Sequence, residues 1–249
     1  MGALVLLVAY AWPHAAGAET LEARFGPPPG AARVAVADGS FGDFLRRLPL
    51  LPRGAAVHLY DGSDKPRQDV HAAVVDLDVP PRDLQQCADA VMRLWAEYRY
   101  ARGALIAFHP DPGRPRALTF DARTHGRADT RHTFERWLIR VFAEAGSASL
   151  EAELRPVDGR RGGGVAPGDV LIQGGYPGHA VLVLDVAVGG DGRRWLLLGQ
   201  SYMPAQQFHV LRNPSSSASP WYDAAALDSP GGLQTPEWRP FFARDLRRF

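Results

Sequence analysis

The clearest periodic pattern of apolar positions lies between residues 83 and 103 and predicts a helix. Asp83 is a good N-cap after two prolines, and Gly103 suits the position that follows a helix C-terminus. With this N-cap, Cys87 becomes the fourth helical residue. The apolar positions recur every three or four residues and so share one helix face; they are Leu84, Cys87, Ala88, Val91, Leu94, Trp95 and Tyr98.

Three further segments carry helical patterns. Residues 41–48 predict a short helix, and residues 127–146 predict a second long amphipathic helix that Asp129 or Thr130 caps. The C-terminal residues 241–249 are expected to close the chain as another short helix.

Strand patterns fill much of the remaining chain. They cover residues 55–63, 68–79, 104–110, 169–173, 179–188 and 193–202. The Gly-Gly-Asp-Gly turn at 189–192 joins the last two strands into an antiparallel hairpin. Residues 213–237 are rich in Ser and Pro and predict a loop. Helices first and an antiparallel sheet afterwards indicate an α+β fold, with N-terminal helices packed on the sheet.

The hairpin brings polar residues together at its open end. Folding it about the turn places His179 opposite residue 202, and residue 181 opposite residue 200, within one or two residues of register. Gln200 and Tyr202 therefore lie beside His179. Gln200 sits among apolar residues, where a buried amide needs a hydrogen-bond partner, and an imidazole is a suitable one. The alternative is an amide with a purely structural role.

Cys87 is the only cysteine of the chain, which excludes an internal disulfide. Thiol catalysis needs a thiolate, a base and a group that orients the base. A helix start favours the thiolate because free N–H groups and the helix dipole stabilise negative charge. The pair Cys87 and His179 is therefore a candidate for nucleophile and base. In the alternative interpretation, Cys87 is a small core residue and His179 a capped turn residue.

The N-terminal residues resemble a targeting segment. Residues 1–18 contain a short apolar run and an Ala-x-Ala cleavage site, which indicates a signal peptide and a periplasmic or secreted protein beginning at Glu19. The alternative is a disordered apolar tail. Residues 19–40 are rich in Pro and Gly and predict a flexible lead-in, so residues 41–249 form the single domain. No segment of the mature chain is long enough to cross a membrane.

Charge and metal-ligand spacing exclude several function classes. The formal net charge of +1 gives no electrostatic field that would attract nucleic acid. Lys65 is the only lysine and every other basic residue is arginine, which we attribute to a GC-rich genome. Asp76 and Asp78 share one face of their predicted strand while His71 points to the other, which is poor geometry for a metal. No cofactor motif is present, so we expect neither metal nor cofactor.

The order of these elements resembles the NlpC-type branch of the papain-like cysteine hydrolases. There, as here, a cysteine at a helix start precedes PGDVLIQ-type and GHAVLVLDV-type strands and a strand that ends in a polar residue. Residues 41–249 more closely resemble an uncharacterised bacterial group, domain-of-unknown-function family 4846. The matching strings are LYDGSDKPRQDVHAAVVDLDV, DLQQCADAVMRLWAEY, PGDVLIQGGYPGHAVLVLDVA, GQSYMPAQ, PWY and TPEW.

The resemblance implies a papain-like core and a thiol hydrolase or acyltransferase that acts on amide bonds, with cell-wall peptides as a candidate substrate. Cys87 would attack, His179 would accept and return the proton, and Gln200, or else Tyr202, would orient the imidazole. N–H groups around Gln86 and Cys87 would help to hold an oxyanion. The alternative is a non-catalytic binding module on the same fold, with Cys87 buried and inert.

Overall fold

The computed structural model describes residues 17–110, 116–123, 130–159 and 163–249. Its α-helices are α1 (Leu21–Arg24), α2 (Phe41–Arg46), α3 (Cys87–Tyr100), α4 (Thr130–Glu144) and α5 (Ser147–Glu153). Its short 3-10 helices include η1 (Gln68–Val70), η3 (Ala224–Asp228) and η4 (Ala243–Asp245).

An antiparallel sheet forms the centre of the described chain, in the strand order β2-β9-β8-β7-β6-β11-β5, with β1 beside β7 and β10 beside β8. Its strands are β1 (Ala31–Arg33), β2 (His71–Val74), β5 (Arg155–Pro156), β6 (Val170–Gln173), β7 (His179–Gly189), β8 (Arg194–Gln200), β9 (His209–Leu211), β10 (Trp221–Asp223) and β11 (Leu246–Arg248). A separate two-stranded sheet pairs β3 (Ile106–Phe108) with β4 (Leu118–Phe120). The fold is thus a mixture of helices and antiparallel sheet, as the sequence predicts.

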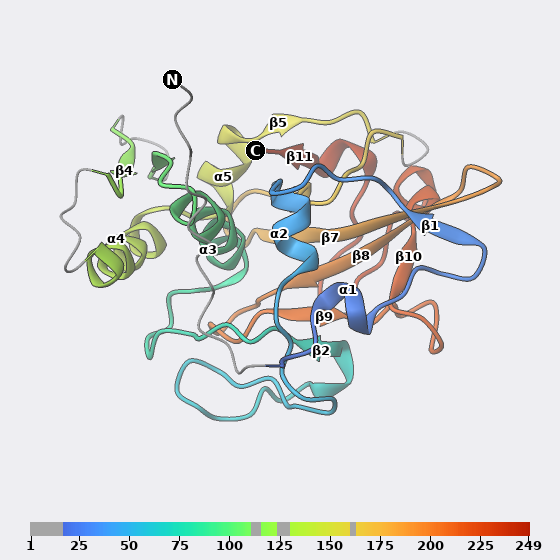
Figure 1. Cartoon of the computed structure of the whole chain (residues 1–249), viewed down its shortest axis with the longest axis horizontal. Helices are drawn as coiled ribbons and strands as arrows, with labels where there is room; N and C mark the ends of the chain where they lie inside the picture. The colour runs from blue at the N-terminus through green and yellow to red at the C-terminus, as the bar shows by residue number, and fades with distance from the viewer. Residues whose placement is uncertain (1–16, 111–115, 124–129, 160–162) are drawn as a thin grey trace, which may run out of the picture.

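Two apolar layers cover the faces of this sheet. Leu182 and Leu184 of β7 belong to the layer that also contains the buried side of α3. Both α2 and α3 pack against β7, and in Figure 1 α2 crosses the strand while α3 lies near its left end. Val181 and Val183 point to the opposite face, where they belong to a second layer shared with the C-terminal segment around η3 and η4. Because both faces of β7 are buried, the strand is apolar at every position from Ala180 to Leu184.

The β7–β8 hairpin has the predicted register at its open end. Leu182 pairs with Gly199, which is the register that places residue 181 opposite Gln200. A bulge between Val183 and Asp185 then shifts the pairing by one residue toward the turn. The predicted neighbourhood of His179 therefore lies in the part of the hairpin that the bulge leaves unchanged.

α3 begins three residues later than Asp83 predicts. Gln86 is the N-cap, and its backbone N–H donates to Asp89 Oδ2 over 3.1 Å. Asp83 instead accepts from the backbone N–H of Ala205 over 2.7 Å, so it fastens the loop before α3 to the loop after β8. Cys87 becomes the first residue of the helix, closer to the positive end of the helix dipole than the sequence suggests.

Other segments also differ from their predictions. Residues 19–40, expected as a flexible lead-in, contain α1 and β1, and β1 pairs with β7. Residues 55–63 make only isolated bridges in place of the predicted strand. The predicted loop at 213–237 contains β10 and η3, and the predicted C-terminal helix at 241–249 is η4 followed by β11.

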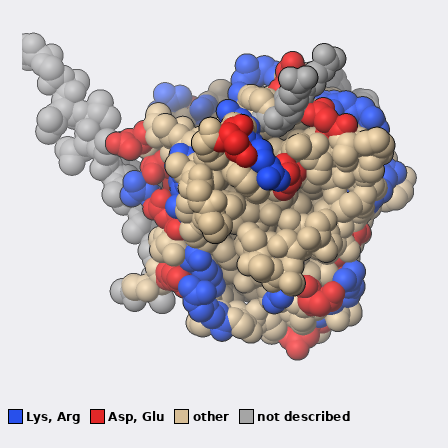
Figure 2. Space-filling view, turned by 90° about the vertical axis from the view of Figure 1, so that its right-hand side faces the viewer, with Lys and Arg blue, Asp and Glu red and all other residues tan. Residues whose placement is uncertain are grey.

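The predictions for residues 1–16 and for capping by Asp129 fall outside the described residues. Among the helices that the structure describes, none combines the length and the apolar character needed to cross a membrane. Figure 2 shows basic and acidic side chains interspersed around a broad uncharged area on one side of the molecule. Charge of one sign therefore does not dominate the described part of this face.

Candidate functional site

The hairpin joins His179 and Gln200 as the register predicts. His179 is the first residue of β7 and its side chain is fully buried. Its Nε2 lies 2.9 Å from Oε1 of Gln200, the last residue of β8. The rings of Tyr202 and Trp238 enclose the imidazole, with centroids 5.1 Å and 5.0 Å away. Within the described residues, Nδ1 of His179 has no hydrogen-bond partner.

Cys87 reaches the same strand end from the side of α3. Its Sγ lies 4.0 Å from the carbonyl oxygen of Gly178, and the backbone N–H of Ala180 also points toward the sulfur. The sulfur thus lies against the peptides on either side of His179. The hydrogen bonds of the described residues include none between Sγ and the imidazole. The structure therefore brings the two residues to the same strand end without a hydrogen bond between Sγ and the imidazole.

Burial keeps both candidate catalytic groups neutral. Burial raises the pKa of the Cys87 thiol to about 11, a rise that the Asp89 charge reinforces and the N–H groups of Ala180 and Ala88 oppose. Burial lowers the pKa of His179 to about 4, and the Lys65 charge lowers it further, against the effect of the Gln200 hydrogen bond. The expected thiolate at the helix start is therefore absent near neutral pH in this state of the protein, because desolvation outweighs the helix dipole.

A cavity of about 230 Å³ opens beside Cys87. Tyr176 stands at this cavity with 77% of its surface exposed, whereas Cys87 is 5% exposed. His179 and Gln200 are not among the described lining residues. A molecule that enters the cavity therefore meets the α3 side of the site first. The lining includes Gln86, Cys87, Asp89, Phe142, Tyr176 and Met203.

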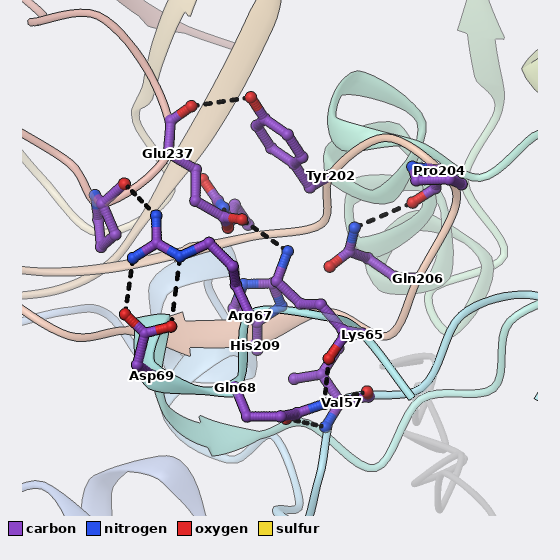
Figure 3. Close-up of polar contacts among 12 residues, drawn as sticks. Val57, Lys65, Arg67, Gln68, Asp69, Tyr202, Pro204, Gln206, His209 and Glu237 are labelled. Atoms are coloured by element: carbon purple, nitrogen blue, oxygen red, sulfur yellow. Dashed lines mark hydrogen bonds and ion pairs between the residues drawn. The ribbon is translucent and has the colours of Figure 1, made fainter. Parts of the chain in front are cut away.

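A buried ion pair lies behind Gln200. Lys65 Nζ lies 2.7 Å from Glu237 Oε1, with side chains only 5% and 8% exposed. The other carboxylate oxygen of Glu237 accepts from Gln200 Nε2 over 2.9 Å. The Tyr202 hydroxyl donates to the backbone carbonyl of Glu237 over 2.8 Å (Figure 3). A continuous polar chain thus runs from Lys65 through Glu237 and Gln200 to His179.

Sequence reasoning missed the outer part of this chain. Lys65 was attributed to base composition, although its being the only lysine among many arginines was a signal. Glu237 and Trp238 lie in the TPEW string, inside a segment predicted as a loop. The Lys65–Glu237 contact spans 172 residues of sequence, and local patterns do not report contacts between such distant residues.

His71 and Asp78, which the sequence analysis considered as metal ligands, have other partners in the structure. His71 Nε2 lies 3.0 Å from the carbonyl oxygen of Ala55, and Asp78 pairs with Arg93 over 2.9 Å. Within the described residues, no group of three or more His, Cys, Asp or Glu side chains is placed to hold a metal ion.

Acid should destabilise the protein through its buried histidines. Burial lowers the pKa of His179 to about 4 and of His209 to about 3, from 6.5. Below pH 6.5 these histidines are protonated in the unfolded chain but remain neutral in the folded chain. The free energy of unfolding is therefore highest above pH 6.5 and falls as the pH is lowered toward 4. Each histidine contributes a slope of about 1.4 kcal/mol per pH unit. Urea unfolding between pH 7 and 4 should show a shallower decline for His179→Gln and His209→Gln. Equal slopes in the wild type and both variants would contradict the burial of His179 and His209 as neutral imidazoles.

The comparisons with known proteins give a family without an assigned activity. The family model described as "Domain of unknown function (4846)" matches residues 21–115 and 114–248. No match was found among curated proteins or among solved structures. Because the two matched segments cover most of the chain, the protein belongs to this family of domains of unknown function.

Proposed function

We propose that the chain is an exported thiol hydrolase or acyltransferase with a papain-like, NlpC-type core. The observation that carries the proposal is the state of His179. Nε2 of His179 is hydrogen-bonded to Gln200, while Nδ1 has no hydrogen-bond partner among the described residues. The sulfur of Cys87 contacts the carbonyl oxygen of Gly178, the residue before His179. A nucleophile, a base and an orienting amide are the parts that thiol catalysis needs.

Both groups start neutral, so proton transfer accompanies attack. The reaction requires Sγ of Cys87 to leave its contact with Gly178 and to hydrogen-bond with Nδ1 of His179. As Sγ bonds to the substrate carbonyl carbon, Nδ1 takes the thiol proton and later gives it to the leaving amine. Water or another acceptor then cleaves the thioester and restores the thiol. Gln86 N–H is engaged with Asp89, so the N–H of Cys87 is the helix-start donor for the oxyanion.

Peptide amides of the cell wall are the substrate class that fits this proposal. The cavity beside Cys87 has room for part of a small peptide, and the exposed ring of Tyr176 at the cavity offers an apolar contact. Export, which residues 1–18 indicate, would bring the protein to such substrates.

Peptidyl acyloxymethyl ketones with alanine and glutamate side chains test the proposal. We expect a covalent adduct on Cys87, visible as a mass increase of the intact protein. Cys87→Ala should form none, and His179→Gln should form it at least about a hundredfold more slowly, since general base catalysis contributes that much or more. Absence of any adduct on folded wild-type protein across the probe set would reject the enzyme.

A binding module with an inert thiol is the second candidate. Two properties of Cys87 favour this candidate: its side chain is buried, and the pKa of its thiol is raised. In addition, His179 is not among the described residues that line the cavity. In that case, peptides without a reactive group should bind wild type and Cys87→Ala equally, and no adduct should form. An adduct that depends on His179 would reject the module.

A further inference from the structure

The buried pair Lys65–Glu237 has a feature that simple packing does not need. Glu237 divides its two carboxylate oxygens between two partners: Oε1 faces Lys65 at 2.7 Å and Oε2 accepts from Gln200 at 2.9 Å. A buried ion pair gives little net stability, because desolvation offsets most of the attraction. Figure 3 shows Lys65 and Glu237 pointing toward one another beneath Tyr202.

The ionised carboxylate determines which way the Gln200 amide faces. A carboxylate only accepts hydrogen bonds, so the NH₂ of Gln200 must point to Glu237 and its carbonyl oxygen must point to His179. That oxygen also only accepts, so the proton of the neutral imidazole must lie on Nε2. Nδ1 of His179 is then the nitrogen with the lone pair, and it is the one without a partner among the described residues.

We infer that Lys65 and Glu237 are positioning residues that, through Gln200, fix His179 in the tautomer with its basic lone pair on Nδ1. Lys65 pairs with one oxygen of the Glu237 carboxylate, and the other oxygen keeps the amide from turning over. With the amide reversed, NH₂ would face Nε2, the proton would move to Nδ1, and the base would be lost. The inference extends the proposed function to residues 65 and 237, and its catalytic consequence rests on that proposal.

Nuclear magnetic resonance of ¹⁵N-histidine protein measures the tautomer directly. The chain has eight histidines, and His179→Gln identifies the signals of His179 by their loss. In wild-type protein at pH 7 we expect His179 with a protonated Nε2 and an unprotonated Nδ1. A protonated Nδ1 in the wild type would overturn the inference outright.

The double variant Lys65→Met, Glu237→Leu tests the cause. Removing both charges together leaves neither partner buried alone, so the fold should survive. We expect the single tautomer of His179 to be replaced by a mixture, and the rate of Cys87 adduct formation to fall about tenfold or more. Glu237→Gln, which still offers an oxygen to Gln200, should keep more of the wild-type tautomer than the double variant. An unchanged tautomer in the folded double variant would overturn the inference.

Arg67→Gln is the matched control. Arg67 donates to the carbonyl oxygen of Pro236 over 3.1 Å, so it touches the same segment as Glu237 without joining the polar chain to His179. Its replacement should leave the tautomer unchanged, and an equal shift in this variant would assign the effect to general loosening of the segment. If the tautomer shifts as expected while Cys87 never forms an adduct, the positioning role stands and the proposed enzyme fails.

Discussion

Replacement of Asp185 by alanine should lower the free energy of unfolding by about 3–5 kcal/mol, the range for breaking a buried ion pair from one side. Asp185 is fully buried beside the bulge of β7. Its carboxylate accepts from Arg33 of β1 over 2.6 Å and from Arg46 of α2 over 2.6 Å. The variant would leave two largely buried guanidinium groups without their shared anion. Urea unfolding at pH 7 measures the loss.

Asp69→Ala provides the control for this prediction. Asp69 pairs with Arg67 on the surface, where the side chains are 69% and 52% exposed, and such pairs contribute at most about 1 kcal/mol. Asp185→Asn keeps the shape and one acceptor oxygen, so it should fall between the two alanine variants. If Asp185→Ala and Asp69→Ala lose similar stability, the buried carboxylate does not anchor the N-terminal elements to the sheet.

The same carboxylate explains why one part of the fold was not predictable. Residues 19–40 have the Pro and Gly content of a flexible segment, and nothing local favours a strand there. β1 forms because β7 offers it an edge near the bulge and because Asp185 binds Arg33. Those partners are about 150 residues apart in sequence, so no window of the sequence contains both.

Elements with strong local patterns were predictable. The β7–β8 hairpin follows from two apolar runs around a glycine-rich turn, and the turn also sets the register that joins His179 to Gln200. The body of α3 follows from its apolar period. Its first residue does not, because Asp83 binds the loop at Ala205 and leaves the cap to Gln86. That exchange moves Cys87 from the fourth helical position to the first.

Protonation states were the least predictable part of the site. From sequence, a cysteine near a helix start suggests a thiolate, and a histidine at a strand mouth is the candidate base. In the structure both side chains are buried, and desolvation moves their pKa values in opposite directions, about 11 for Cys87 and about 4 for His179. Burial is a property of the whole fold, so residue identity and spacing give no measure of it.

Alkylation of Cys87 by iodoacetamide should therefore follow a pKa near 11 in the folded protein. Relative to a thiol with a pKa of 9.0, two units leave about a hundredfold less thiolate at pH 7. The midpoint of the pH profile is the quantity to measure, since poor access to a side chain only 5% exposed lowers the rate at every pH alike. Unfolding in urea should restore an ordinary midpoint.

His179→Ala separates the two accounts of this thiol. Iodoacetamide needs only a thiolate, so the midpoint near 11 should change little in the variant if His179 is neutral in the resting protein. The peptidyl ketones need a proton acceptor during attack, so the same variant should slow their reaction strongly. A wild-type midpoint near or below 8.5 that rises in His179→Ala would instead show a thiolate–imidazolium pair, and would contradict the neutral resting state. Because Cys87 is the only cysteine, every cysteine adduct in these experiments forms on this one sulfur.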